Sequence, residues 1–100
     1  MSAKIALDGT EYLTLPVTAT RGGVTIDVTG DPVAWIFVAV GAPSPAVGAA
    51  WLTGDWSAGE ARLLFAPSSA VGARGTYDAW LKVTASPEVI IKRAGQVIVL

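Results

Sequence analysis

The stretch from Gly75 to Val83 constrains the fold of this chain more than any other segment. Tyr77, Ala79, Leu81 and Val83 fall on one phase of a two-residue period, and polar or amphipathic residues fill most of the other phase. Successive side chains of a β-strand point to opposite faces of the sheet, so one face of this strand is apolar. The segment therefore predicts a strand with one face in a hydrophobic core.

A glycine two positions before a tyrosine, at the start of such a strand, is typical of the penultimate strand of an immunoglobulin-like sandwich. The ring of Tyr77 is then expected to pack inward while its hydroxyl bonds to the backbone a few residues upstream. Antibody domains have a disulfide cysteine two residues after this tyrosine, where this chain has Ala79. With no cysteine in the sequence, packing alone must hold the sandwich. The predicted core is Trp35, Phe37, Tyr77, Ala79 and Leu81.

The rest of the chain also has a period of two, and no segment shows sustained helical spacing. Turn signals occur every eight to twelve residues, which is the spacing of a sandwich. The strands that we expect are 12–20, 24–29, 33–40, 50–56 with an interruption at Gly54, 60–66, 75–83, 89–92 and 96–100. The sequence thus predicts an all-β fold: one immunoglobulin-like antiparallel β-sandwich domain of seven to eight strands, spanning residues 1–100, with no disulfide.

Residue types in two of these strands indicate where the strand lies or which way its side chains point. Pro16 cannot donate a ladder hydrogen bond, which places strand 12–20 at a sheet edge or at a break between sheets. In strand 24–29 the alternation predicts that Val24, Ile26 and Val28 face inward. Edge strands can pair with a neighbouring chain, and we expect the first and last strands to be the candidates.

Strand 33–40 is apolar on both faces. Val33, Trp35 and Phe37 suit the core between the sheets. The opposite face carries Ile36, Val38 and Val40, which need a cover of their own. Either the loop that follows or another chain must supply that cover.

Composition also indicates spare apolar surface. Of the 100 residues 52% are hydrophobic and 15% are charged, whereas an average soluble domain has about 25% charged residues. One interpretation is that small alanine and valine side chains, scattered singly, raise the hydrophobic count. A partner that buries an exposed apolar patch is the interpretation that we favour.

The residues that commonly carry chemistry are missing or isolated. Without histidine or cysteine the chain lacks the usual general base, metal ligands and sulfur nucleophile. Asp27 and Asp31 flank a turn where calcium is conceivable, although calcium loops are usually more acidic. We therefore expect no enzyme activity, no cofactor and no metal site. A net charge of −1 argues against a nucleic-acid partner.

No segment predicts membrane insertion or secretion. The longest apolar run, 33–40, has eight residues, whereas a helix that spans a bilayer needs about 20. The N-terminus has no apolar run of signal-peptide length. We expect a soluble protein that is made in the cytoplasm and has no membrane partner.

Three further tryptophans are candidates for contact with a partner. Trp51 and Trp56 bracket Gly54, where a bulge could bring their side chains to one face. Trp80 lies on the outward phase of its strand, where it either covers a neighbouring lysine stem or anchors a contact. The candidate interface residues are Trp51, Trp56, Trp80, Ile36, Val38 and Val40.

Taken together, the strands and turns resemble small immunoglobulin-like virion proteins of tailed bacteriophages, particularly those that infect actinobacteria. The matching segments are 11–17, 27–33, 75–83, 86–88 and 95–99. The Thr29-Gly30-Asp31-Pro32 and Gly75-Thr76-Tyr77 pieces are also similar to the N-terminal sandwich of phage baseplate upper proteins. The match covers nearly the whole chain, but it is a pattern of strands and turns with no catalytic signature.

The resemblance implies a structural protein present in many copies in the virion. It implies contacts with other virion proteins, most simply decoration of the capsid shell as a minor capsid protein. A head–tail connector or a tail or baseplate accessory is the first alternative, and a carbohydrate-binding adhesion module on the virion surface is the second. An interaction domain of the cytoplasm, unrelated to phage, is a further class.

Overall fold

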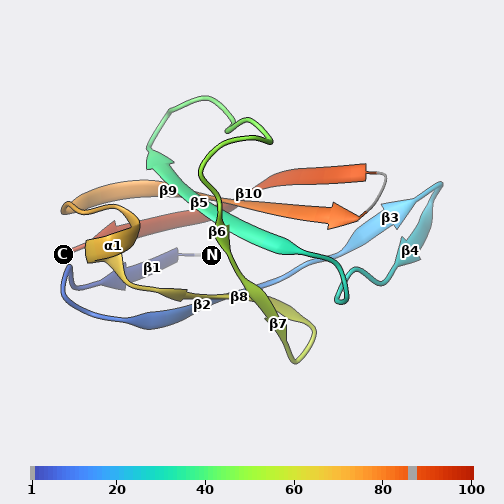
Figure 1. Cartoon of the computed structure of the whole chain (residues 1–100), viewed down its shortest axis with the longest axis horizontal. Helices are drawn as coiled ribbons and strands as arrows, with labels where there is room; N and C mark the ends of the chain where they lie inside the picture. The colour runs from blue at the N-terminus through green and yellow to red at the C-terminus, as the bar shows by residue number, and fades with distance from the viewer. Residues whose placement is uncertain (1, 86–87) are drawn as a thin grey trace.

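Two β-sheets pack face to face in the computed structural model, which describes residues 2–85 and 88–100 (Figure 1). The five-stranded sheet has the order β1 (Ser2–Ile5), β10 (Glu88–Val99), β9 (Gly75–Ala85), β5 (Val33–Ala39) and β6 (Leu52–Thr53). The three-stranded sheet has the order β2 (Glu11–Pro16), β8 (Glu60–Phe65) and β7 (Asp55–Ser57). A separate hairpin joins β3 (Ala19–Arg21) to β4 (Val24–Ile26), and one helical turn, α1 (Pro67–Ala70), precedes β9.

The predicted all-β sandwich without a disulfide is confirmed. The described residues form ten strands instead of seven to eight. Strand β1 was not predicted, and the predicted strands 12–20 and 50–56 are each divided in two. The predicted strands 89–92 and 96–100 are one strand, β10.

Each of these two predicted strands is divided at a residue that interrupts the backbone hydrogen bonding between strands. Strand β2 lies at a sheet edge and ends at Pro16, as its missing N–H predicts, and the chain then leaves for the β3–β4 hairpin. At Gly54 the chain crosses from the five-stranded to the three-stranded sheet, and the Gly54 N–H donates to the carbonyl of Val33 at 2.9 Å. A Cβ at this position would lie 2.6 Å from the carbonyl oxygen of Arg62, so only glycine fits.

The break predicted between strands 89–92 and 96–100, at Ala94 and Gly95, is wrong. These residues form an irregularity inside β10, where the pairing with β9 shifts between Arg93 and Gly95. Gly95 has a φ of 148°, which glycine adopts without strain, so the strand continues past the extra residue. The expectation that the last strand lies at an edge is also wrong, because β10 lies between β1 and β9.

The inward orientation predicted for all of Val24, Ile26 and Val28 is wrong for the first of these. Val24 is 66% exposed, Ile26 is half-buried and Val28 is buried. The β3–β4 hairpin lies at one end of the long axis of the molecule (Figure 1), and Val24 directly follows its Gly22–Gly23 turn. The alternating pattern therefore predicts a strand here, but it does not predict how far each apolar side chain is buried.

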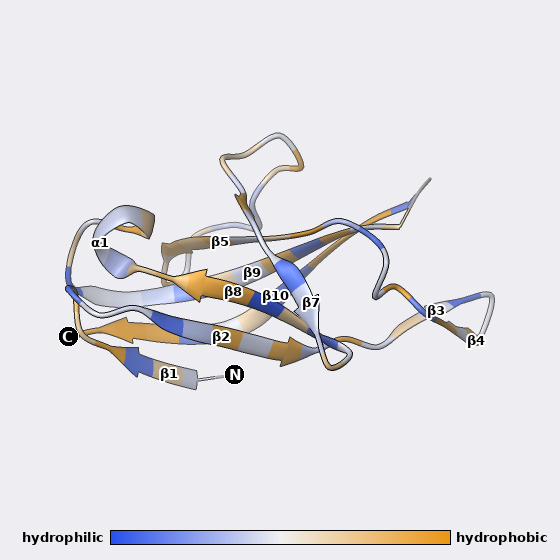
Figure 2. Ribbon diagram, turned by 60° about the horizontal axis from the view of Figure 1, so that its bottom comes forward, coloured by the Kyte–Doolittle hydropathy of each residue, from blue (hydrophilic) through white to orange (hydrophobic). Residues whose placement is uncertain are grey.

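The core lies between the two sheets. Trp35, Ala79 and Leu81 are fully buried as predicted, while Phe37 and Tyr77 are partly buried and pack against the same cluster. The three-stranded sheet contributes residues such as Phe65, whose ring centroid lies 4.4 Å from that of Phe37. Figure 2 shows the alternation of hydrophobic and hydrophilic residues along β2 that gives this sheet its inner face.

The hydroxyl of Tyr77 donates a hydrogen bond to the carbonyl of Ala73 at 2.9 Å, which confirms the upstream bond expected for this tyrosine. The division of the strands also agrees with an immunoglobulin-like fold. Strands β2, β7 and β8 share one sheet, and β5, β9 and β10 share the other. The immunoglobulin-like class itself stays a prediction, which these two observations support.

Candidate interaction surface

The outer face of the five-stranded sheet holds most of the predicted interface residues. On β5 and β9 the outward residues are paired across the strands: Ala34 with Lys82, Ile36 with Trp80, and Val38 with Asp78. Ile36, Val38 and Trp80 are each half-buried, and we call these three the outer apolar strip. Val40 lies just beyond the end of β5 and is 50% exposed.

The loop 40–51 supplies part of the cover that this face was expected to need. The Gly41 N–H donates to a carboxylate oxygen of Asp78 at 3.2 Å, and the ammonium of Lys82 donates to the carbonyl of Val47 at 3.2 Å. Both anchors are on the outward phase of β9, with Trp80 between them in sequence. The loop is thus bound to the sheet on either side of Trp80, yet the outer apolar strip stays partly exposed.

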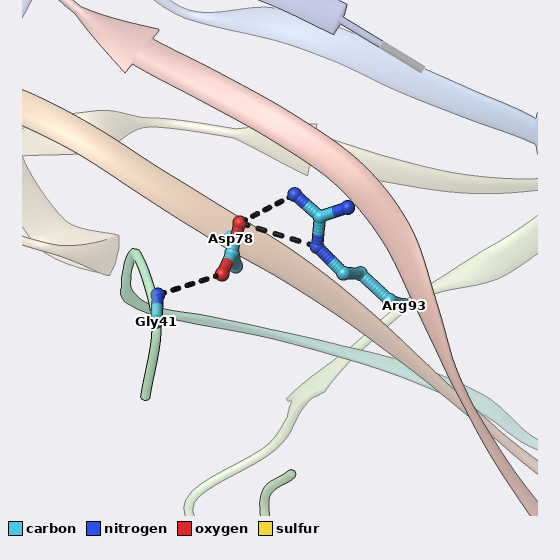
Figure 3. A network of polar contacts seen from close by, with 3 residues as sticks. All are labelled: Gly41, Asp78 and Arg93. Carbon is cyan, nitrogen blue, oxygen red and sulfur yellow. Dashed lines mark hydrogen bonds and ion pairs between the residues drawn. The ribbon is translucent and has the colours of Figure 1, made fainter. Parts of the chain in front are cut away.

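Asp78 is the most buried charged residue among those described, at 5% exposed. Its Oδ1 accepts hydrogen bonds from Arg93 Nε at 3.2 Å and Nη2 at 2.7 Å, and its Oδ2 accepts the Gly41 N–H (Figure 3). Arg93 holds the pKa of Asp78 below its ordinary value against the opposing effect of burial, and Gly41 and Gln96 lower it further. Asp78 is therefore a structural anchor for β10 and for the loop, and it stays ionised at neutral pH.

The three candidate tryptophans do not form one exposed cluster. Trp80 lies on the outward face as predicted, and its buried Nε1–H has no hydrogen-bond partner among the described residues. The Trp51 indole donates to the carbonyl of Ala46 at 3.0 Å, and its ring lies 5.0 Å from Lys82 Nζ. Trp56 belongs to the three-stranded sheet, packs against the core and donates to the carbonyl of Asp31 at 2.7 Å. Gly54 thus separates Trp51 and Trp56 instead of aligning them.

The acidic residues serve local structure. Asp27 Oδ1 accepts from the Thr29 N–H at 3.0 Å and from the Thr29 hydroxyl at 2.7 Å, and these bonds lower the pKa of Asp27. Asp55 forms a two-bond ion pair with Arg62 at 2.7 and 3.0 Å, which lowers the pKa of Asp55. Within residues 2–85 and 88–100 no group of three or more His, Cys, Asp or Glu side chains could hold a metal ion.

A second apolar patch lies on the outer face of the three-stranded sheet. Tyr12 and Leu64 are opposite each other on β2 and β8, and both are more than half exposed. The guanidinium of Arg62 lies 4.4 Å from the centre of the Tyr12 ring. The sequence analysis did not select this patch or the anchors Asp78, Lys82 and Arg93. The alternation of β2 and β8 is the signal that could have indicated the patch, whereas the anchors depend on which strands are neighbours.

Comparison of the chain with protein-family models, with curated proteins and with solved structures finds no match. No helix in the described part of the chain is long and apolar enough to cross a membrane.

Proposed function

We propose that this protein is a structural component of a bacteriophage virion that decorates the capsid shell through protein–protein contacts. The observation that carries the proposal is the outer apolar strip, a partly exposed row of Ile36, Val38 and Trp80 on a regular sheet. The resemblance of the strand and turn pattern to small phage virion proteins supports the phage setting.

The strip suits contact with a protein surface. Apolar area removed from water contributes roughly 25 cal/mol per Å², and tryptophan is enriched among residues that dominate binding. Val40 extends the apolar surface past the end of β5. A single strip of this size gives a weak contact, but many copies on one symmetric shell would act together by avidity.

The edges of the sheets offer a second mode of contact. Strands β1 and β2 lie at the edges of their respective sheets. An edge strand can add a strand from a neighbour through backbone hydrogen bonds. The last strand, β10, was expected to pair with a neighbouring chain, but it lies between β1 and β9 in its own sheet. The edge strands β1 and β2 are therefore the candidates for such pairing.

Particle binding tests the proposal directly. Purified virions of the phage that encodes this chain should contain it, and the chain should co-sediment with capsids that lack it. Val38→Asp should reduce co-sedimentation at least tenfold, because it places a charge in the outer apolar strip. Val24→Asp is the matched control, since Val24 is exposed on the β3–β4 hairpin, away from the strip.

Absence of the chain from purified virions would overturn the proposal. Presence in separated tails but not in heads would replace decoration of the capsid with a tail or baseplate role. A glycan that binds the wild type but not Trp80→Ala, with no capsid binding, would favour the adhesion module.

A further inference from the structure

A groove of about 320 Å³ opens beside the outer apolar strip. Its floor includes Ala34 and Lys82, which face each other across β5 and β9 on the outer face. The remaining lining residues are Pro32, Val33, Ala49, Trp51, Thr53 and Thr84. The groove therefore lies between the sheet and the far end of the loop 40–51.

The groove contains a cation without an acidic partner. Lys82 is half-buried, and its ammonium contacts the Val47 carbonyl and the Trp51 ring. Among the described residues it forms no ion pair, whereas Arg21, Arg62 and Arg93 each pair with a carboxylate. No Asp or Glu is among the described residues that line the groove. An ammonium has three donors, so Lys82 can still bond an incoming acceptor.

The remaining lining restricts the ligand to a small one. Thr53 and Thr84 add two hydroxyls, and the alanines and Pro32 add an apolar wall. Ligand sites span roughly 300–1,000 Å³, so this groove is at the lower limit and suits one side chain. Phosphate sites use clustered basic groups or arginine forks, and a single lysine matches a single carboxylate better.

We propose that this groove binds an acidic side chain, glutamate or aspartate, on the partner protein, with Lys82 as the counterion. The carboxylate accepts from Lys82, the threonine hydroxyls are available to its second oxygen, and its methylene group contacts the apolar wall. This inference rests on the proposed function, because it names the chemistry of the partner at the same outer face. It predicts that the partner presents an acidic residue next to an apolar patch.

Solution NMR of the isolated chain tests the groove without any particle. The probe is N-acetyl-glutamate N-methylamide, and its neutral match is N-acetyl-glutamine N-methylamide. The acid should give saturable shifts of the Trp51 indole N–H and of the Ala34, Thr53 and Thr84 amides, with a Kd of about 1 mM. The neutral amide should bind at least tenfold more weakly. Lys82→Met should lose the shifts, and Lys92→Met should keep them because Lys92 lies elsewhere on β10.

The comparison of acid with amide uses the wild-type chain, so it stays decisive even if Lys82→Met unfolds. Equal binding of both probes, or no saturation by the acid, would overturn the proposal. A null titration combined with normal co-sedimentation would reject the groove while leaving the capsid role intact. Saturable binding of the acid with no co-sedimentation would support the groove and reject the capsid role.

Discussion

The two faces of the five-stranded sheet each carry a tryptophan, and the two side chains are enclosed in different ways. Trp35 on the inner face is fully buried, and the backbone of Gly54 lies directly against its indole. Trp80 on the outer face is half-buried, between loop anchors made by Asp78 and Lys82. Neither Nε1–H has a partner among the described residues. Contact with backbone encloses the inner tryptophan, whereas a loop held by polar anchors partly covers the outer one.

The largest effect is expected at the inner face. Gly54→Ala places a Cβ 2.6 Å from the Arg62 carbonyl oxygen and 2.9 Å from Trp35 Cδ1. Because backbone cannot move aside cheaply, the free energy of unfolding should fall by about 2–3 kcal/mol. Urea denaturation measures this change. The control is Gly48→Ala, where a Cβ would meet nothing within 4 Å and the change should stay within about 0.5 kcal/mol. Equal effects at both positions would contradict the close packing at Gly54.

Loss of the hydrogen bond that Tyr77 makes at the start of β9 should lower stability by a smaller amount. Tyr77→Phe removes the hydrogen bond to the Ala73 carbonyl and keeps the ring, so stability should fall by about 1 kcal/mol. Tyr12→Phe is the matched control, since the exposed Tyr12 hydroxyl has no hydrogen-bond partner among the described residues. If thermal unfolding shows the two variants to be alike, the Tyr77 bond does not stabilise the fold.

The outer-face anchor Asp78 predicts a pH dependence. Its pKa is lowered in the folded state, so between the two pKa values the unfolded chain binds more protons. The resulting stability is present above the ordinary value of 3.8 and is lost as pH falls through the folded pKa. Asp78→Asn should lower stability at pH 7 and flatten its decline below about pH 5. Since Arg93 is half exposed, water replaces part of the lost bond and the effect is modest.

Denaturant midpoints measured between pH 7 and pH 2 test this dependence. Asp27 and Asp55 also have lowered pKa values, so some slope should remain in Asp78→Asn. Asp8→Asn is the control, because its exposed carboxyl has no hydrogen-bond partner among the described residues. An unchanged slope in Asp78→Asn would show that the anchor does not depend on ionisation.

The smallest effect is expected for Val38→Thr on the outer face of β5, and the same substitution at Val33 on the inner face serves as the comparison. Val38→Thr on the half-exposed outer face should change stability by no more than about 0.5 kcal/mol. Val33→Thr buries a hydroxyl in the core, where Val33 is almost fully enclosed, and should cost about 1–3 kcal/mol. Similar values in chemical denaturation would mean that the outer face is as well packed as the core.

Features set by neighbouring residues along the chain were predictable. The upstream bond of Tyr77 and the end of β2 at Pro16 follow from residue types a few positions apart. The inward phase of β9 follows from its strict alternation. Features that depend on which strands are neighbours were missed. The burial of Asp78 requires Arg93 on β10 and Gly41 in a loop, 15 and 37 residues away.

The alternation of apolar residues determined by itself that Trp35, Ala79 and Leu81 lie on the apolar faces of their strands, because side-chain direction in a strand depends only on position parity. Tertiary structure alone decided how each apolar stripe is covered. Val24 has a strand pattern but is 66% exposed, whereas Trp80 lies between the loop contacts of Asp78 and Lys82. A side chain is buried only when a segment from elsewhere in the chain packs against it, and a local sequence pattern does not show which segment does so.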